Sequence, residues 1–273
     1  MNVLSLFDGM SCGQIALNKL GIEYDRYFAC EIDKFAMQVT QHNYPLTEQL
    51  GSVTDLDTSE LPKIDLLIGG SPCQSFSNLG NGKGFDGKSS LFWEYVRILK
   101  ETKPKYFLLE NVVMKKEWQA IITEAMGVEP IKMNSRNVSA QNRPRLFWTN
   151  IPITQPEDLK IFVKDIVDTE VEDKYYLSDL AIAKVQRSKF GREYATLDTE
   201  KVRTLTAGYY KIPGDGVYFQ DHKGKRRYTP TECERLQTVP EGYTEICSNS
   251  QRWKMLGNGW TVDLIANIFK NIN

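Results

Sequence analysis

Short apolar runs alternate with segments of helical spacing through the first half of the chain. The predicted strands are residues 2–7, 26–30, 66–68, 106–109 and 146–148. The predicted helices between them are residues 12–20, 34–42 and 91–100. This order of elements is typical of βαβ units, so the sequence predicts an α/β fold with a mainly parallel sheet and helices on both faces.

The alternation ends in the middle of the chain. Residues 151–226 are polar and form only short segments. Pro230 then suits the first turn of a helix that Thr229 would cap and that continues to Leu236. A last helix is expected at 262–269. A chain of 273 residues is long enough for one large domain with a smaller subdomain.

Composition excludes several classes of protein. No apolar stretch reaches the length of a membrane span, and the amino terminus lacks the charge pattern of a secretory signal, so we expect a cytoplasmic protein without a membrane partner. The five cysteines include no Cys-x-x-Cys pair, and only two histidines could join them, so no metal site is expected.

The distribution of charge is more informative than the net charge of −1. Residues 181–228 carry eleven Lys and Arg against five Asp and Glu, together with five tyrosines, and they include the run Lys223-Gly224-Lys225-Arg226-Arg227. Concentrated positive charge beside aromatic rings suits a phosphate backbone. An ordinary solvated surface is the alternative interpretation.

Chemically active side chains follow or precede three of the predicted strands. Cys73 comes just after the strand at 66–68 and its Gly-Gly end, and Glu110 follows the strand at 106–109. Arg143 and Arg145 precede the strand at 146–148. Open α/β sheets bind their ligands at the carboxyl ends of parallel strands, so a thiol, a carboxylate and two guanidinium groups have a common edge on which to meet.

The turn after the first strand suits a nucleoside ligand. The glycines of the turn from Phe7 to Gly13 let the backbone bend tightly and approach a ligand, and Glu31 follows the second strand, where a carboxylate can bind ribose hydroxyls. Asp8 would repel a pyrophosphate. S-adenosylmethionine, a common nucleoside cofactor without phosphates, therefore fits better than a dinucleotide, and a purely structural turn is the alternative.

Taken together, these motifs closely resemble those of the DNA cytosine-5 methyltransferases. They occur in the family's order over nearly the whole chain: the turn 7–13, Glu31, Pro72-Cys73-Gln74, Glu110-Asn111-Val112, Gln141-x-Arg143-x-Arg145, 227–237 and Gly257-Asn258. The compact size is similar to that of bacterial and phage enzymes, and 110–114 and Trp260 resemble the vertebrate de novo enzymes. The resemblance implies a Rossmann-like S-adenosylmethionine-dependent methyltransferase fold.

The resemblance also assigns catalytic roles. Cys73 is expected to add to carbon-6 of a cytosine that is flipped out of double-stranded DNA, which activates carbon-5 for methylation. Glu110 is expected to protonate N3, and Arg143 and Arg145 are expected to hold O2. The Gly-rich segment 78–87 is similar to the family's mobile loop over the flipped base.

For the cofactor, the resemblance assigns a set of binding residues. They are Phe7, Asp8, Gly9 and Gly13 at the methionine end, Glu31 at the ribose, Ile32 and Val53 near the adenine, and Pro72, Leu91, Asn258 and Trp260 around the remaining pocket. The family usually has an Asp for the adenine amino group where this chain has Ser52. Either the Ser52 hydroxyl or the Asp55 carboxylate is expected to contact the adenine amino group instead.

The resemblance divides the chain into two functional parts. Residues 1–150, completed by 227–273, are expected to form the cofactor-binding and catalytic domain, and 151–226 the target-recognition region, in which Thr204-Leu205-Thr206-Ala207 resembles the family's Thr-Leu element. We expect a monomer of the restriction-modification kind, with any cognate restriction endonuclease acting separately. An RNA cytosine methyltransferase, a catalytically silent DNA-binding protein and a nicotinamide-dependent oxidoreductase are the rival hypotheses.

Overall fold

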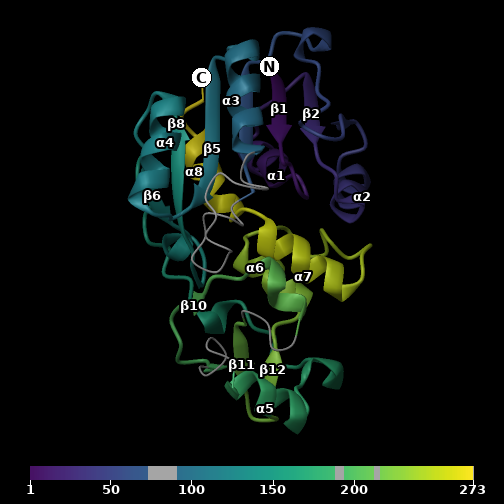
Figure 1. Ribbon diagram of the computed structural model, residues 1–273. Helices are drawn as coiled ribbons and strands as arrows, with labels where there is room; N and C mark the ends of the chain where they lie inside the picture. Colours follow the sequence, from purple (N-terminus) through teal and green to yellow (C-terminus); the bar gives the residue numbers. More distant parts are fainter. Residues whose placement is uncertain (73–90, 188–193, 212–215, 273) are drawn as a thin grey trace. The chain divides into compact units, whose positions relative to one another are not determined.

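The computed structural model describes residues 1–72, 91–187, 194–211 and 216–272 (Figure 1). Cys73 and the Gly-rich segment 78–87 lie outside the described residues. The chain forms two compact units, which we call unit 1 (Met1–Met133, Pro144–Gln155 and Ile265–Asn273) and unit 2 (Asn134–Arg143 and Pro156–Leu264). No helix among the described residues has the length and apolar character needed to span a bilayer.

Unit 1 is built on a sheet whose described strands run in the order β3-β2-β1-β4-β5-β8-β6. Their bounds are β1 (Asn2–Leu6), β2 (Arg26–Cys30), β3 (Glu48–Gln49), β4 (Leu66–Gly70), β5 (Tyr106–Val112), β6 (Ile131–Asn134) and β8 (Pro144–Thr149). Strands β3, β2, β1, β4 and β5 are parallel, and β8 is antiparallel to β5. The expectation of a mainly parallel sheet is confirmed.

The order of the strands reverses between β1 and β4, because the chain continues from β1 to β2 on one side and later returns to β4 on the other. Such a switch point opens a crevice at the carboxyl ends of the strands, where α/β proteins bind their ligands. The Phe7–Gly13 turn follows β1 and Ser71-Pro72 follows β4, so both flank this crevice.

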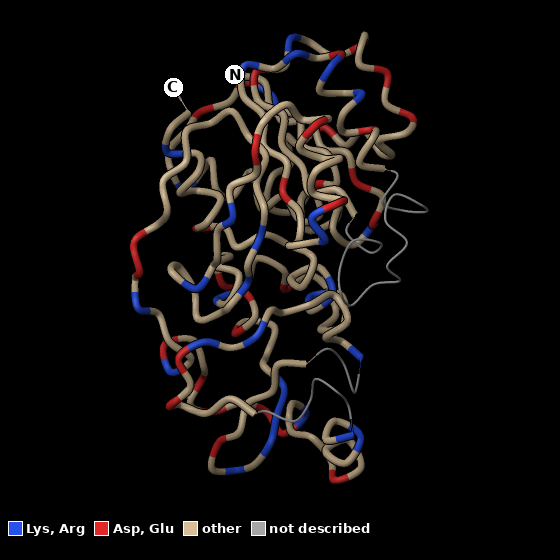
Figure 2. Tube along the Cα trace, turned by 60° about the vertical axis from the view of Figure 1, so that its left-hand side comes forward, with Lys and Arg blue, Asp and Glu red and all other residues tan. Residues whose placement is uncertain are grey.

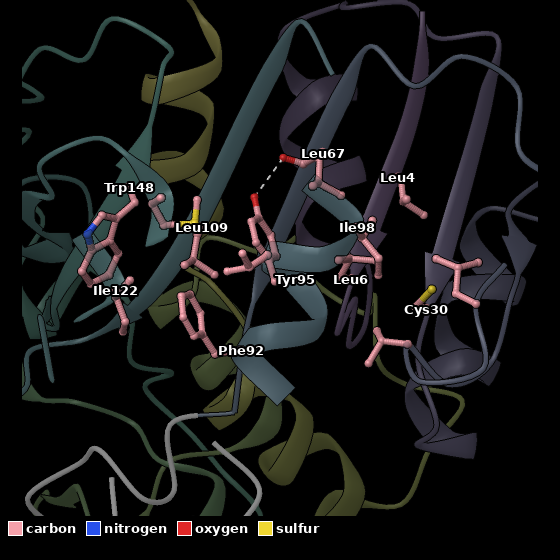
Figure 3. Packing of buried hydrophobic residues seen from close by; sticks show 14 of the residues in the cluster. Leu4, Leu6, Cys30, Leu67, Phe92, Tyr95, Ile98, Leu109, Ile122 and Trp148 are labelled. Atoms are coloured by element: carbon pink, nitrogen blue, oxygen red, sulfur yellow. Dashed lines mark hydrogen bonds between the residues drawn. The ribbon is translucent and has the colours of Figure 1, made fainter. Parts of the chain in front are cut away.

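Both faces of the sheet are covered, which explains why its strands are apolar on both sides. On one face, Leu4 and Leu6 of β1 and Leu67 of β4 are buried in one cluster with residues of helices α3 (Phe92–Thr102) and α4 (Lys116–Met126) (Figure 3). The intervening residues Leu66 and Ile68 are also fully buried. The other α-helices among the described residues of unit 1 are α1 (Cys12–Lys19), α2 (Lys34–Asn43) and the end of α8 (Val262–Phe269).

Unit 2 has small sheets and short helices. Its described strands are β7 (Gln141–Asn142), which pairs with β10 (Val202–Arg203), and a sheet of β9 (Tyr194–Ala195), β11 (Tyr218–Gln220) and β12 (Lys225–Arg227). Its described α-helices include α5 (Asp179–Arg187), α6 (Pro230–Leu236) and α7 (Asn249–Asn258), and short 3-10 helices lie between the strands. Helix α6 begins as predicted, since the Thr229 hydroxyl accepts from the Glu232 amide and the Glu232 carboxylate accepts from the Thr229 amide.

The two compact units do not coincide with the two expected functional parts. Residues 134–143 and 227–264 belong to unit 2 together with 156–226, whereas the sequence interpretation joined them to the catalytic domain. The physical reason is packing: the side chains of Arg226 and Glu232 pair inside unit 2, which ties β12 and α6 into one core.

Candidate active site

The turn after β1 has an unusual backbone. Phe7, Gly9 and Ser11 have φ values of 57°, 60° and 61°, which fall in the left-handed region. This conformation is costly for Phe7 and Ser11 and free for Gly9. Among the described residues, apart from its two chain neighbours, no heavy atom lies within 4 Å of the position that a Cβ of Gly9 would take, so the described part of the turn presents open backbone at the edge of the sheet.

Asp8 is enclosed by its own turn. Its carboxylate accepts hydrogen bonds from the Tyr27 hydroxyl at 3.0 Å and the Ser11 hydroxyl at 2.5 Å. Burial of this carboxylate raises its pKa from 3.8 to about 6, and the nearby charge of Glu31 acts in the same direction. Asp8 thus keeps the turn in shape, and its carboxyl group takes up a proton at a higher pH than an ordinary aspartate does.

The Glu31 carboxylate is fixed by three backbone amides. One oxygen accepts from Gly9 N at 2.7 Å, and the other accepts from Ile32 N at 2.7 Å and from Asp33 N at 2.8 Å. A carboxylate has about four acceptor positions, so these bonds still leave capacity for a hydroxyl group. The large apolar side chain of Ile32, next in the chain, is 78% exposed.

These features fit a nucleoside. An oriented acceptor suits ribose hydroxyls, an exposed aliphatic side chain suits the face of a base, and the open turn at Gly9 leaves room for the rest of the ligand. The residues present therefore fit the S-adenosylmethionine that the sequence predicted.

The residues predicted to contact the adenine form hydrogen bonds with their own neighbours in the chain. The Ser52 hydroxyl lies 2.7 Å from the Thr54 hydroxyl, which in turn donates to the Asp55 carboxylate at 3.1 Å. Val53 is buried and its carbonyl accepts from Arg97 at 3.2 Å. Leu91 precedes α3 and packs partly buried against the core. Ser52 and Asp55 are thus joined through Thr54, and the choice between them stays a prediction.

Glu110 and Arg145 form an ion pair at the end of β5. Arg145 Nε lies 2.7 Å from Glu110 Oε1, and the two side chains are only 13% and 12% exposed. The register explains the pair: Glu110 lies opposite Phe147 and Val112 opposite Arg145, so Glu110 and Arg145 are diagonal neighbours on one face of the sheet. The sequence predicted that these two residues would meet.

The strand end that leads to Cys73 is held in place by Asn111. The Asn111 side-chain amide is buried and donates to the carbonyl of Ser71 at 3.2 Å and to its hydroxyl at 3.1 Å. Ser71 and Pro72 are the last described residues before Cys73. The role of Asn111 was not identified from the sequence, although its place next to Glu110 on a strand end was the available signal.

Arg143 makes different contacts from those expected. Its guanidinium is buried in unit 2 and donates to the carbonyls of Leu205 at 2.7 Å, Gly257 at 3.2 Å and Gly259 at 2.8 Å. Such contacts favour a positioning role over contact with a base. Two other predicted cofactor residues, the exposed Asn258 and the half-buried Trp260, also belong to unit 2.

The basic run at 223–227 is not one continuous phosphate-binding surface. The Arg226 side chain is fully buried and pairs with Glu232 at 2.8 Å and Asp221 at 3.1 Å, and the Arg227 guanidinium lies 3.6 Å from the centre of the Trp253 ring. The prediction of phosphate contacts is therefore wrong for Arg226 and Arg227, because both are core residues of unit 2. Lys223 is exposed. Figure 2 shows in blue how Lys and Arg are distributed along the described chain.

Comparisons with known proteins identify the family. The model of the family described as C-5 cytosine-specific DNA methylase matches residues 1–273. The chain is 33% identical to the type II methyltransferase M1.ScrFI of Lactococcus lactis subsp. cremoris over 87% of this chain and 69% of the relative. It is 30% identical to the type II methyltransferase M.NlaX of Neisseria lactamica over 97% of this chain and 94% of the relative.

Solved structures share the fold. The methyltransferase EhMeth of Entamoeba histolytica matches with a TM-score of 0.83 at 18% identity, covering 100% of this chain and 99% of that one. The Dnmt2 methyltransferase of S. pombe matches with a TM-score of 0.77 at 18% identity and the same coverage.

Proposed function

Because the chain belongs to the C-5 cytosine-specific DNA methylase family and is a DNA cytosine-5 methyltransferase, we propose that it acts on a cytosine flipped out of double-stranded DNA, through a covalent bond from Cys73 to carbon-6. Carbon-5 of cytosine is a poor nucleophile in the intact ring. Addition of a thiolate to carbon-6 converts the ring to an enamine whose carbon-5 is reactive. Carbon-6 is inaccessible inside a duplex, which is why the base must leave the stack.

The observation that carries this proposal is the Glu110–Arg145 pair. Cytosine presents two neighbouring acceptors, N3 and O2. The Glu110 carboxylate, once it has taken up a proton, can donate to N3, and the guanidinium of Arg145 can donate to O2. Their mutual orientation on one face of β5 and β8 supports such two-point recognition. The same donors are stabilising when negative charge develops on the ring after thiolate addition.

The proposed reaction begins with addition to carbon-6 and ends with release of the Cys73 thiolate. The Cys73 thiolate forms a bond to carbon-6 while N3 receives a proton from Glu110. When bound, S-adenosylmethionine supplies the methyl group that carbon-5 accepts. A base then removes the proton from carbon-5, the bond to Cys73 breaks to regenerate the thiolate, and N3 returns its proton to Glu110.

The residues proposed to hold S-adenosylmethionine come mainly from the crevice of unit 1. Glu31 would bind the ribose, Ile32 would cover the adenine, and the Phe7–Gly13 turn would hold the methionine end. The further residues in this proposal are Ser52, Val53, Pro72 and Leu91 of unit 1 and Asn258 and Trp260 of unit 2. We also propose that 151–226 reads the DNA target and that the enzyme acts as a monomer, separately from any cognate endonuclease.

The covalent step can be tested with a fluorinated substrate. The DNA sequence that the protein methylates is first identified by expressing the protein in a methylation-deficient bacterium and bisulfite-sequencing the genome of that bacterium. A duplex of that sequence is then made with 5-fluorocytosine at the target. Because fluorine cannot leave carbon-5 as a proton does, elimination should stall, and a denaturation-resistant protein–DNA complex should accumulate only when S-adenosylmethionine is present.

Three variants identify the groups involved. Cys73→Ser should abolish the complex, since an alkoxide forms far less readily than a thiolate. Glu110→Gln should slow its formation by about 10²–10⁴-fold. Cys233→Ser, at a fully buried thiol of α6, is the matched control and should leave the complex intact. Retention of the complex in Cys73→Ser would show that another group is the nucleophile, and tight DNA binding without any complex would favour a silent binding protein.

A further inference from the structure

A buried polar cluster in unit 2 joins two segments that are far apart in the sequence. One is the segment 204–207, and the other is the turn 257–260 at the end of α7. Arg143 donates to the carbonyl of Leu205 in the first and to the carbonyls of Gly257 and Gly259 in the second. One guanidinium therefore bonds both segments at once.

Two glutamines extend the same connection. The fully buried Gln141 accepts from the amide of Leu205 at 2.7 Å and lies 3.2 Å from the side chain of Gln237. Gln237, also fully buried, donates to the carbonyls of Leu256 at 2.6 Å and Gly259 at 3.2 Å. The cluster is thus a continuous set of hydrogen bonds from one segment to the other, and polar groups so deeply buried are costly to separate.

Backbone packing ties the segments together directly. A Cβ on Gly257 would lie 2.2 Å from the carbonyl carbon and oxygen of Thr206 and 2.5 Å from the nitrogen of Ala207. Only a glycine allows so close an approach of α7 to the backbone of 204–207. The two segments accordingly have little freedom to move independently of each other.

We propose that Arg143 is a positioning residue that couples the binding of DNA to the binding of cofactor. This inference rests on the proposed function, in which 204–207 belongs to the target-recognition region and Asn258 and Trp260 of the second segment line the cofactor pocket. A ligand that orders one segment then orders the other, so the second ligand binds with a smaller entropic cost. The coupling is reciprocal by thermodynamic necessity.

The residue type suits this task. The planar guanidinium of arginine presents five donors in a fixed fork, so one side chain can bond three carbonyls that face it from two segments. A lysine at the same place has a single ammonium on a flexible stem, and an uncharged glutamine has only two donors. Both replacements should weaken the connection, the glutamine more than the lysine.

The first test needs no ligand. In the free protein, amide hydrogen exchange of peptides covering 202–210 and 255–262 should accelerate together in Arg143→Gln and less in Arg143→Lys. The control is Arg235→Gln, at another arginine of unit 2, which bonds Ile166, Asp168 and Glu241 and contacts neither segment through the bonds identified. Unchanged exchange in one of the two segments of Arg143→Gln would overturn the proposed connection.

The second test measures the coupling itself. The Kd for S-adenosylhomocysteine is determined by calorimetry with and without a duplex of the methylated sequence. We expect DNA to lower this Kd by about 5-fold or more in the wild type, the ordinary range for coupled sites. The factor should fall towards one in Arg143→Gln, recover in part in Arg143→Lys and persist in Arg235→Gln.

The outcomes separate this inference from the function on which it rests. A wild type that binds both ligands without coupling, or a folded Arg143→Gln that keeps the full coupling factor, would refute the positioning role while leaving the proposed function intact. If Arg235→Gln also lost the coupling, general destabilisation of unit 2 would explain both variants, and the positioning role of Arg143 would be refuted. A wild type that binds neither ligand would refute both.

Discussion

At the scale of single residues, Asp8 is the clearest case of a desolvated carboxylate next to the candidate cofactor site. Its pKa of about 6 lies above the ordinary 3.8, so the folded protein binds this proton more tightly than the unfolded chain. The resulting contribution to stability is complete below pH 3.8 and is lost as the pH rises to about 6. With 1.36 kcal/mol for each pKa unit, the loss is about 3 kcal/mol.

We predict that Asp8→Asn stabilises the protein at pH 8 by up to about 3 kcal/mol relative to the wild type, and that the difference shrinks towards zero near pH 4. Asparagine keeps the shape of the side chain and an acceptor for Tyr27 without the cost of a buried charge. Urea unfolding of both proteins between pH 4 and pH 8 measures their free energies of unfolding. The contributions of all other titrating groups cancel in the difference between the two proteins. A difference that is constant with pH would contradict the assignment.

Glu31 is the residue whose loss should weaken cofactor binding most directly. Glu31→Gln keeps the size of the side chain but removes the charge that ribose hydroxyls would contact, which costs about 1.5–3 kcal/mol for a charge-assisted hydrogen bond, or about ten- to a hundredfold in Kd. Calorimetry with S-adenosylhomocysteine measures the change. Glu48→Gln is the control, since Glu48 is half-exposed in β3 and pairs with Arg26. Equal affinities of the wild type and Glu31→Gln would reject the assignment.

At the scale of elements, the sequence predicted the strands that are apolar because they are buried on both faces, and it predicted a helix whose first turn carries capping residues. The central strands are apolar throughout because both faces of the sheet are covered, and α6 carries the Thr229, Pro230 and Glu232 signals of a helix start. Helices α4, α5 and α7 were missed: much of the sequence of α5 and α7 is polar, and in α4 only Ile122 and Met126 are buried, which makes a weak apolar stripe. Strands β7 and β10 have two residues each, which is too short for any periodicity to appear.

In the candidate site, the spacing of Arg143 and Arg145 in the sequence did not predict where each side chain lies. Arg143 and Arg145 are two positions apart, so on a single strand they would share a face and reach the same ligand. In the structure β7 ends at Asn142 and β8 begins at Pro144, so Arg143 lies between two strands. Arg145 pairs with Glu110 in unit 1 and Arg143 bonds carbonyls of unit 2. A change of strand between two residues is set by tertiary packing, which spacing alone does not reveal.

The contact between α7 and the backbone at 206–207 gives a prediction at this scale. In an exposed helix, Gly→Ala would be stabilising by about 1 kcal/mol. At Gly257 the new Cβ would meet backbone atoms at 2.2 Å, which cannot move as a flexible side chain can. Overpacking costs about 1–3 kcal/mol, so the clash should outweigh the gain in helix propensity and Gly257→Ala should be destabilising.

Urea unfolding of Gly257→Ala measures this net effect. Ser250→Ala, at an exposed residue of the same helix, should change the stability by no more than about 0.5 kcal/mol. A Gly257→Ala protein as stable as the Ser250→Ala control would mean that the helix is free to move away from 206–207.

At the scale of the whole molecule, a net charge of −1 means that any attraction to DNA depends on local charge. Within 181–228 the two arginines of the basic run, Arg226 and Arg227, are buried in unit 2. The exposed cations that remain among the described residues of this segment include Lys184, Arg187, Lys211 and Lys223. Removing a buried arginine and removing an exposed lysine should therefore have different consequences.

For the exposed cations, we predict that replacing one that contacts a phosphate with Ala reduces the slope of log K against log salt concentration by about one. Fluorescence anisotropy with the methylated sequence, measured at several salt concentrations, gives the slope for Lys184→Ala, Arg187→Ala, Lys211→Ala and Lys223→Ala. Arg226→Ala should behave differently: it leaves Glu232 buried without its partner, so the cost is about 3–5 kcal/mol of folding stability. Its slope should match the wild type at a temperature where it is folded, since a side chain with no exposed surface releases no counterion. If all four exposed variants keep the wild-type slope, the segment 181–228 does not bind the DNA backbone through these residues.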